Sequence, residues 1–200
     1  MTTLHLPDPA TEIGAALEVA LAACDEADAI SLASFRRRIH VEAKPDASFV
    51  TEADTAVELA IRERLTTRFP EHGLVGEEYG EAPSDSGRRW IIDPIDGTHN
   101  YMRGVPLYAT LLALEIGGEL MVGAVSAPAL HRRWFSWAGG GAWAVETVPG
   151  GWDRGSASPI AVSDVGRLDE ASVIYSSFVS TANSGFVPGF ANLLGKVWRE

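Results

Sequence analysis

Residues 90–101, WIIDPIDGTHNY, run from an apolar segment into two aspartates three positions apart and then into a Gly-Thr turn. Trp90–Ile92 has the composition of a short buried strand, and Pro94 is expected to end it because proline cannot donate to a ladder. Asp93 and Asp96 should therefore lie at the exit of the strand. Carboxylate oxygens gathered in one turn are ligands that suit Mg²⁺. The segment predicts a metal site at a strand end.

The turn after the aspartates is suited to binding an anion. Gly97 allows the backbone to approach a ligand closely, and Thr98 is predicted as a helix N-cap whose neighbouring N–H groups face the ligand. The same residue types also make ordinary tight turns, so an isolated Asp-x-x-Asp would favour a plain loop. The complete hexapeptide after a strand, preceded by Gly76-Glu77-Glu78, favours a site. A polar turn over residues 81–87 would bring the two strand ends to one edge.

Two helices are predicted before this segment. The first runs from about Thr11 to Arg38, and its last three residues, Arg36–Arg38, are interpreted as dipole complements in the final turn rather than as a phosphate-binding patch. The second follows Thr51 and ends at Phe69-Pro70. Thr51 and Asp54 have the spacing of a capping arrangement, which requires no catalytic role.

The residues after the motif predict an antiparallel sheet packed on the two helices. Its expected strands are Leu107–Ile116, Leu120–Ala127, Arg133–Trp137 and Ala142–Val145. Residues 147–159 are rich in Gly, Pro and Ser and are predicted as a connection between layers, with new strands at Ile160–Ser163 and Ser172–Ser176. We expect an N-terminal α+β metal-binding layer at 1–146 and the start of a C-terminal α/β layer at 147–200.

The overall composition excludes several classes of protein. Sixteen basic and 27 acidic residues give a net charge of −11, which argues against a nucleic-acid partner. No apolar segment reaches membrane-spanning length and no signal-peptide pattern is found, so a cytoplasmic protein without membrane contact is expected. Cys24 is the single cysteine, which excludes an internal disulfide and a zinc cluster.

The motif resembles the signature of the inositol monophosphatase family. Gly76-Glu-Glu78 and the run from Lys44 to Asp54, with its Val-Thr-x-x-Asp pattern, are similar to two further segments of that family. Within it, Gly104–Leu114 and Ser126–Trp134 look most like the histidinol-phosphate phosphatase branch of actinobacterial type. The resemblance implies a layered α-β-α-β-α sandwich, with a large antiparallel sheet packed on two N-terminal helices, and a homodimer.

The resemblance also implies an activity and a cofactor. The expected enzyme is a Mg²⁺-dependent phosphomonoesterase acting on a small phosphorylated alcohol. The first expectation is histidinol phosphate, converted to histidinol in histidine biosynthesis, and the alternative is inositol 1-phosphate. By the family motif, Glu77, Asp93, the Ile95 carbonyl and Asp96 would hold two or three Mg²⁺ ions per site.

The family motif assigns the remaining site residues as well. Asp96, Gly97 and Thr98 would bind the substrate phosphate. Thr98 and Asp54 would be the catalytic pair that positions the attacking water, so Asp54 would both cap a helix and serve the reaction.

The chain departs from the family pattern at its end. It stops at Trp198–Glu200, inside a predicted helix, before the last metal-binding Asp of the family, so a truncated chain is expected. Trp152-Asp153 resembles the later Trp-Asp metal motif but falls in the predicted connection, and we do not assign it to the site. A catalytically incomplete fragment that folds or associates without turnover remains an alternative, and it predicts an exposed apolar face.

A haloacid-dehalogenase-type phosphatase is a second alternative. Its Asp-x-Asp-Gly-Thr loop supplies a covalent nucleophile from the first Asp. Pro94 stands at that position here, so the spacing disfavours this interpretation.

Overall fold

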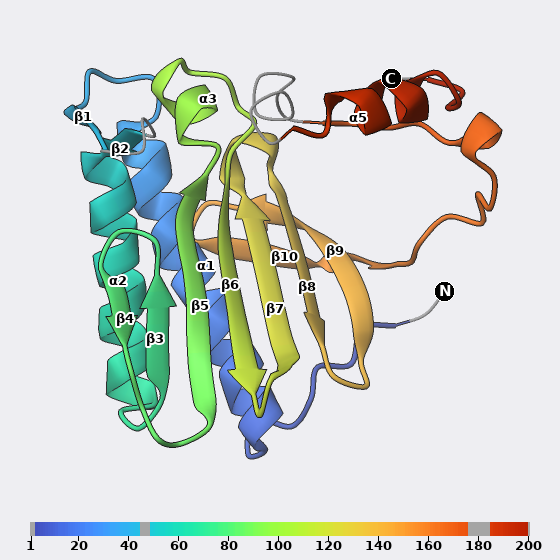
Figure 1. Ribbon diagram of the computed structural model, residues 1–200. Coiled ribbons are helices and arrows are strands. Elements are labelled where there is room, and N and C mark those ends of the chain that lie inside the picture. The colour runs from blue at the N-terminus through green and yellow to red at the C-terminus, as the bar shows by residue number, and fades with distance from the viewer. Residues whose placement is uncertain (1–2, 45–48, 176–184, 200) are drawn as a thin grey trace. The chain divides into compact units, whose positions relative to one another are not determined.

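The computed structural model describes residues 3–44, 49–175 and 185–199 (Figure 1). The chain divides into two compact units, residues 1–160 and residues 161–200, and each is described by itself. No helix in these described ranges is both long and apolar enough to cross a membrane.

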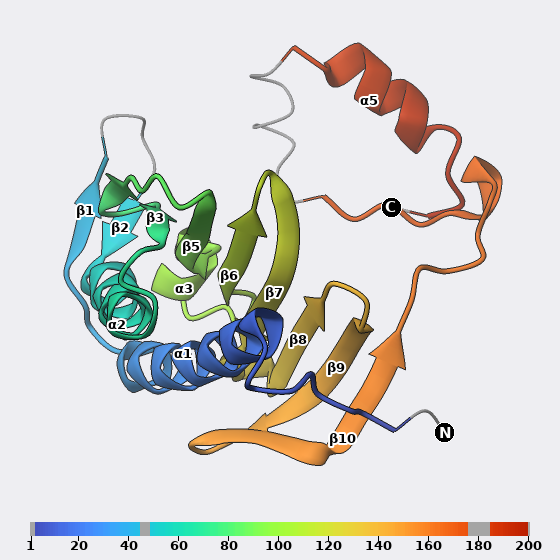
Figure 2. The ribbon, with the colours of Figure 1, turned by 90° about the horizontal axis from the view of Figure 1, so that it is seen from below.

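The first unit packs two helices against one face of a sheet (Figure 2). The helices are α1 (Glu12–Ser34) and α2 (Glu52–Arg68). The sheet has eight strands in the order β10-β9-β8-β7-β6-β5-β3-β4. These are β3 (Gly73–Gly76), β4 (Gly80–Ala82), β5 (Arg88–Asp96), β6 (Ala109–Ile116), β7 (Glu119–Ala127), β8 (Arg132–Trp137), β9 (Gly141–Val148) and β10 (Gly151–Ile160). A short hairpin of β1 (Val41–Ala43) and β2 (Phe49–Thr51) precedes α2.

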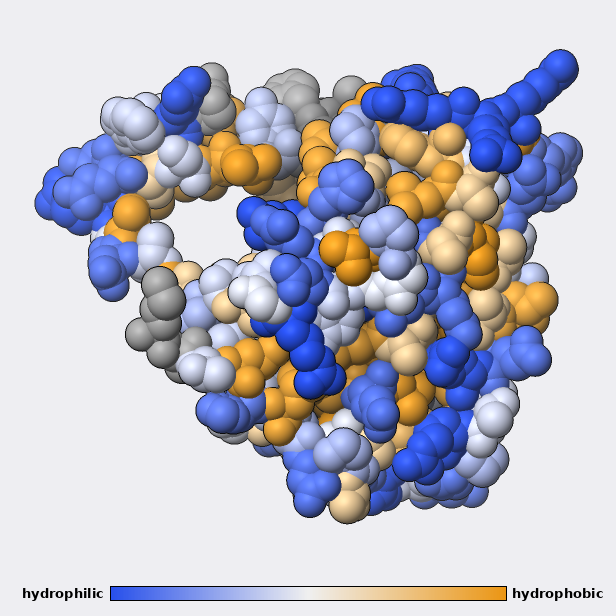
Figure 3. Space-filling view, turned by 180° about the vertical axis from the view of Figure 1, so that it is seen from behind, coloured by the Kyte–Doolittle hydropathy of each residue, from blue (hydrophilic) through white to orange (hydrophobic). Residues whose placement is uncertain are grey.

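The sheet alternates between a core face and an open face. Trp90 and Ile92 of β5 are buried in the core with the apolar residues of α1 and α2, whereas Ile91 and Asp93 line a groove of about 410 Å³. The groove is otherwise lined almost entirely by apolar side chains of β6–β10. On the opposite side, which carries the helices, hydrophilic residues cover much of the surface with hydrophobic ones between them (Figure 3). The period of two along β5 thus separates core residues from Asp93.

Helix α1 ends earlier than the sequence predicted, whereas helix α2 ends where it was expected to end. α1 ends at Ser34, four residues early, because Phe35 is extended and Arg36 has a positive φ of 60°. Arg36–Arg38 therefore lie beyond the helix, and their interpretation as dipole complements in its last turn was wrong. α2 ends before Phe69 as predicted, and its capping box is confirmed in both directions, between the Thr51 side chain and the backbone of Asp54 and between the Asp54 side chain and the backbone of Thr51.

Pro94 does not end its strand. β5 continues to Asp96, with a register shift between Asp93 and Asp96 against β6. The missing N–H of Pro94 falls in this irregularity, and its carbonyl accepts a hydrogen bond from Thr110 Oγ1 at 2.8 Å. The prediction was wrong because a bulge removes the need for a donor at that position.

The predicted antiparallel sheet is confirmed for the strands after the motif, β6 to β9. The sheet as a whole is mixed, because β3 and β5 are parallel, and all its other neighbours are antiparallel. One prediction about the sheet was wrong. The expected connection at residues 147–159 is largely strand: β10 pairs with β9 across a register shift and carries Trp152-Asp153. A Gly- and Ser-rich composition is tolerated there because β10 is an edge strand. Only Ile160 of the expected strand Ile160–Ser163 lies in a strand.

The second unit contains little regular structure. It has a short 3₁₀ turn at Leu168–Glu170, the helix α5 (Val187–Leu194) and an isolated parallel bridge between Ser172 and Arg199. α5 ends before Trp198 and Arg199, so the prediction of a helix there was wrong, and Glu200 lies outside the described residues. In the expected strand Ser172–Ser176, Ser172 makes only the bridge and Ser176 lies outside the described residues. The compact units divide at Ile160, whereas the expected domain boundary was at residue 146.

Candidate active site

The parallel pair of β3 and β5 brings Glu77 and Asp93 together. Gly76 at the end of β3 pairs with Ile92, and the Glu77 N–H donates to the Ile92 carbonyl at 3.3 Å. Because parallel strands end at the same edge, the residue after β3 and the residue after Ile92 become neighbours. The expectation that the two strand ends share one edge is confirmed.

Asp93 lies beside other carboxylates and forms no ion pair with the described residues. Burial, together with the neighbouring Glu77 and Asp96 carboxylates, raises the pKa of its carboxyl group to about 7. Its Oδ1 atom is buried and has no hydrogen-bond partner among the described residues. A buried acceptor without a partner, surrounded by carboxylates, is a position where a cation would be favourable.

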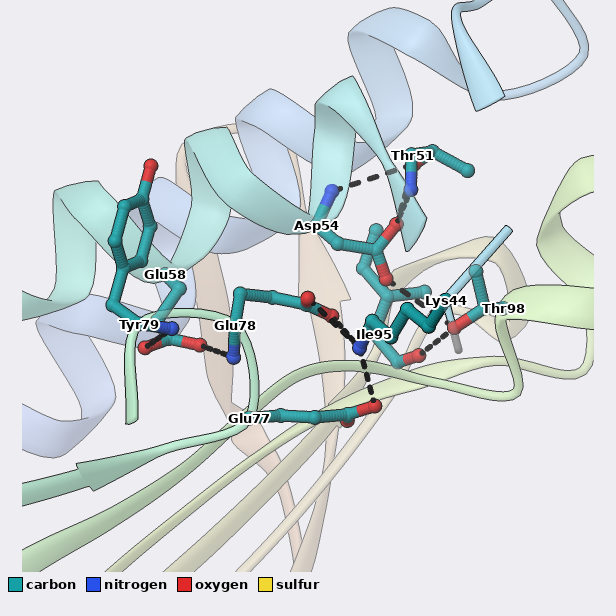
Figure 4. A network of polar contacts seen from close by, with 9 residues as sticks. All are labelled: Lys44, Thr51, Asp54, Glu58, Glu77, Glu78, Tyr79, Ile95 and Thr98. Carbon is teal, nitrogen blue, oxygen red and sulfur yellow. Dashed lines mark hydrogen bonds and ion pairs between the residues drawn. The ribbon is translucent and has the colours of Figure 1, made fainter. Parts of the chain in front are cut away.

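Lys44 supplies the positive charge nearest to this cluster. Its Nζ lies 3.2 Å from Glu77 Oε1 and 2.8 Å from the Glu78 carboxylate (Figure 4). Burial raises the pKa of Glu78, and the hydrogen bond from Lys44 opposes that shift. Lys44 thus balances the outer part of the cluster, while Asp93 and Asp96 form no ion pair with any described residue.

The candidate metal ligands fit Mg²⁺ by donor type. Glu77, Asp93, Asp96 and the Ile95 carbonyl offer only oxygen, which is the chemistry that hard divalent cations require. Within residues 3–44, 49–175 and 185–199, no three His, Cys, Asp or Glu side chains already converge as a metal-binding group. Glu77 accepts a hydrogen bond from Lys44 (Figure 4), so a cation bound there would compete with the Lys44 ammonium group for this carboxylate.

Asp54 and Thr98 are in contact although they are 44 positions apart. Thr98 Oγ1 is 3.3 Å from Asp54 Oδ1 and 3.1 Å from the Ile95 carbonyl, the two acceptors available to its hydroxyl (Figure 4). Asp54 Oδ2 accepts from the Thr51 N–H at 2.8 Å. One oxygen of Asp54 therefore completes the helix cap while the other faces Thr98. Burial raises the pKa of Asp54, and the hydrogen bonds from Thr51 and Thr98 counteract it.

Gly97 shapes the turn that carries Thr98. It has a positive φ of 87°, and a side chain there would place Cβ 2.9 Å from the Leu107 carbonyl. Gly97 is also the N-cap of the short helix α3 (Thr98–Met102), so the prediction of Thr98 as N-cap was wrong by one residue. Thr98 is the first helical residue, which leaves its hydroxyl free to point back toward Asp54.

Asp96 is exposed, as is Glu77, whereas Asp93 is only partly exposed. Asp96 follows the bulge of β5 and pairs with Ala109, so its side chain lies near the surface whereas Asp93 is partly covered. Asp93 and Asp96 therefore differ in solvent exposure although they are only three positions apart in the sequence.

Glu58 is a buried residue of this network that the sequence analysis missed. It lies on α2, is 0% exposed, and accepts hydrogen bonds from the backbone N–H groups of Glu78 and Tyr79. A signal was present, because Val57, Glu58 and Ile61 fall on the buried stripe of a helix, where an acidic residue is unusual.

Similarity to known proteins identifies the family of this chain. The profile of the inositol monophosphatase family matches residues 14–194. This chain belongs to the inositol monophosphatase family. It is 43% identical over 186 residues to a histidinol-phosphatase of Mycobacterium tuberculosis, covering 92% of this chain and 68% of that protein. It is 44% identical over 190 residues to a histidinol-phosphatase of Streptomyces coelicolor, with the same two coverages.

A solved structure supports the fold as well. An IMPase from Thermotoga maritima superposes with a TM-score of 0.76 at 26% identity, covering 92% of this chain and 66% of that one. Membership of the family makes the chain a phosphoric monoester hydrolase of α+β fold.

Proposed function

We propose that this chain hydrolyses histidinol phosphate to histidinol and inorganic phosphate with Mg²⁺ as cofactor. The substrate is inferred from the 43% identity to a histidinol-phosphatase over 92% of the chain. The cofactor is inferred from Asp93, whose buried Oδ1 has no hydrogen-bond partner among the described residues and lies beside two further carboxylates. We also propose that the protein is a homodimer and that it is located in the cytoplasm.

The residues proposed for the metal are Glu77, Asp93, Asp96 and the Ile95 carbonyl, which would hold two or three ions. Bound Mg²⁺ would supply positive charge that polarises the phosphate, lowers the pKa of water and stabilises the leaving alkoxide. Asp93 would have to lose its proton first, since only the carboxylate is a ligand.

The residues proposed for water are Thr98 and Asp54. The Asp54 carboxylate would accept the Thr98 hydroxyl hydrogen, which leaves the lone pairs of Oγ1 to accept a hydrogen bond from water. Water held in this way would be oriented for attack on phosphorus. Its oxygen would bond to phosphorus as the bond from phosphorus to the alcohol oxygen breaks. One proton of the attacking water would pass to solvent, and the leaving alcohol oxygen would take a proton from solvent. The Gly97 and Thr98 N–H groups, together with Asp96, are proposed to border the phosphate.

The substrate test compares phosphate release from histidinol phosphate and from inositol 1-phosphate at equal Mg²⁺. We expect kcat/KM for histidinol phosphate to be at least tenfold higher. A preference for inositol 1-phosphate would replace the substrate and keep the family assignment, whereas turnover of neither would favour the alternative of an incomplete fragment.

The residue test replaces Thr98 in two ways. Thr98→Val keeps the shape and removes the hydroxyl, and we expect kcat to fall roughly 10²–10³-fold, as for the loss of one positioned hydrogen-bonding group. Thr98→Ser keeps the hydroxyl and should retain activity within about tenfold. Equal loss in both variants would contradict the role of Oγ1.

A second candidate function is supported by one observation. The groove on the open face of the sheet is lined almost entirely by apolar side chains, which is the feature expected of a fragment that associates without turnover. Phosphate release by the chain as given separates this alternative from the first.

A further inference from the structure

Glu58 connects helix α2 to the segment that carries the candidate ligand Glu77. Its Oε2 accepts from the Glu78 N–H at 2.7 Å, and its Oε1 accepts from the Tyr79 N–H at 3.1 Å. Figure 4 shows the carboxylate facing these two nitrogens. Both contacts are made by the backbone immediately after Glu77.

Arg62 completes the contact one helical turn later. Its Nε donates to Glu58 Oε1 at 2.7 Å, and its Nη2 donates to the Gly80 carbonyl. Glu58 and Arg62 together therefore bind the segment at residues 78, 79 and 80. Since an i, i+4 pair on a helix can satisfy itself, the two additional backbone contacts show that the carboxylate is also directed at this segment.

The close approach depends on the residue before Glu77. Gly76 has no side chain, and a Cβ built there would lie 1.9 Å from Glu58 Oε1. The side chain of Glu58 thus occupies space that only glycine leaves free. This packing places the carboxylate directly beneath the turn between β3 and β4.

A carboxylate suits this position better than an amide. Two backbone N–H donors require two acceptor oxygens, and a carboxylate has acceptors on both. An amide has one oxygen and one NH₂ group, so one of the N–H groups would face another donor. A buried donor left without an acceptor is unfavourable, because it has lost its hydrogen bonds to water.

We propose that Glu58 is a positioning residue for Glu77. It fixes the backbone of residues 77–79 and thereby sets the affinity of the site for Mg²⁺. The inference rests on the proposed function, because it takes Glu77 as a ligand. Partners that orient a metal ligand from outside its coordination sphere typically change metal affinity about 10–100-fold when removed.

The test uses Glu58→Gln with Glu63→Gln as its matched control. Glu63 lies on the exposed face of the same helix and undergoes the same chemical change. Calorimetric titration with MgCl₂ should show the dissociation constant raised about 10–100-fold in Glu58→Gln and unchanged in Glu63→Gln. In the metal-free protein, hydrogen exchange at the Glu78 or Tyr79 amide should accelerate at least about tenfold in Glu58→Gln alone, as expected when a hydrogen bond is lost.

A second variant keeps the inference testable if Glu58→Gln does not fold. Gly76→Ala places a methyl group where the Glu58 carboxylate lies, so it should displace that carboxylate. We expect it to weaken Mg²⁺ binding and to accelerate exchange at the Glu78 or Tyr79 amide, as in Glu58→Gln. Wild-type Mg²⁺ affinity in a folded Glu58→Gln protein, or faster exchange without any change in affinity, would overturn the inference alone. Absence of Mg²⁺ binding by the unaltered chain would overturn the proposed cofactor and the inference together.

Discussion

At the scale of single residues, Asp93 is the most perturbed acid of the candidate site. Its pKa of about 7 lies well above the ordinary value of 3.8, because of burial and of the carboxylates of Glu77 and Asp96. A carboxyl group of this kind is protonated in about half of the molecules near pH 7 when no cation is bound. Protons and Mg²⁺ would therefore compete for Asp93.

We expect Asp93→Asn to change the pH dependence of stability in the metal-free protein. The folded pKa is raised, so the stabilisation by the proton is fully present below the unfolded pKa and is lost as pH rises through about 7. The Asn variant has no such proton to lose. In EDTA it should gain on the order of 2 kcal/mol relative to wild type between pH 5 and pH 8, after allowance for solvent screening.

Urea denaturation at the two pH values measures this difference. Asp85→Asn, at an exposed turn position, is the matched control and should leave the pH dependence unchanged. A difference between Asp93→Asn and wild type that does not vary with pH would contradict the raised pKa. In Mg²⁺, the same variant should lose turnover, since it lacks the carboxylate ligand.

At the scale of elements, a hydrogen bond anchors helix α3 to helix α1. The Tyr101 hydroxyl donates to the Ser31 carbonyl of α1 at 2.7 Å, and Tyr101 is 1% exposed. Phe35 and Tyr108 pack against its ring. Because α3 begins with Thr98, this contact ties the position of the candidate catalytic hydroxyl to α1.

We expect Tyr101→Phe to lower the free energy of unfolding by about 1 kcal/mol, the net value of one buried hydrogen bond. The turn at Gly97 should also become less well positioned, so KM for the phosphate substrate should rise. Chemical denaturation and steady-state kinetics measure the two effects.

Tyr108→Phe is the matched control in the same aromatic cluster. The Tyr108 hydroxyl is buried and makes no hydrogen bond with the described residues, so its removal should be neutral or stabilising. Equal destabilisation by the two substitutions would show that the Tyr101 hydrogen bond contributes nothing specific.

At the scale of the first unit, a buried charge network joins the helix layer to the sheet. Arg133 of β8 is 0% exposed, and its Nη1 and Nη2 donate to Asp25 at 2.7 Å and to Asp28 at 2.8 Å on α1. Its Nε donates to Ser126 Oγ of β7 at 3.0 Å. Burial raises the pKa of Asp28, and the charge of Arg133 opposes the shift.

We expect Arg133→Met to destabilise the fold by about 3–5 kcal/mol, because it leaves Asp28 buried without its cation. Adding Asp28→Leu should recover part of this loss, since both charges are then absent. Urea denaturation of the three proteins measures the effect. A double variant as unstable as the single one would indicate that packing, and not charge pairing, is what Arg133 contributes.

Much of the architecture followed from local patterns. The apolar runs at β6–β9 and the capping residues of α2 predicted elements that the structure contains, because alternation and capping are short-range properties. The bulge at Pro94 and the strand β10 could not be read in this way. Whether a Pro or a Gly-rich segment joins a sheet depends on which backbone groups its neighbour leaves unpaired.

The sequence alone determined the family and the residues proposed for the chemistry. The hexapeptide from Asp93 to Thr98, with Glu77 and Asp54, is enough to identify both, because the order of residue types in a short motif can be recognised without the fold. Tertiary structure decided what surrounds them: the parallel pairing that brings Glu77 beside Asp93, the contact of Lys44 with Glu77, and the support of that segment by Glu58. These depend on contacts between residues more than fifteen positions apart, and burial and unpaired charge exist only once the chain has folded.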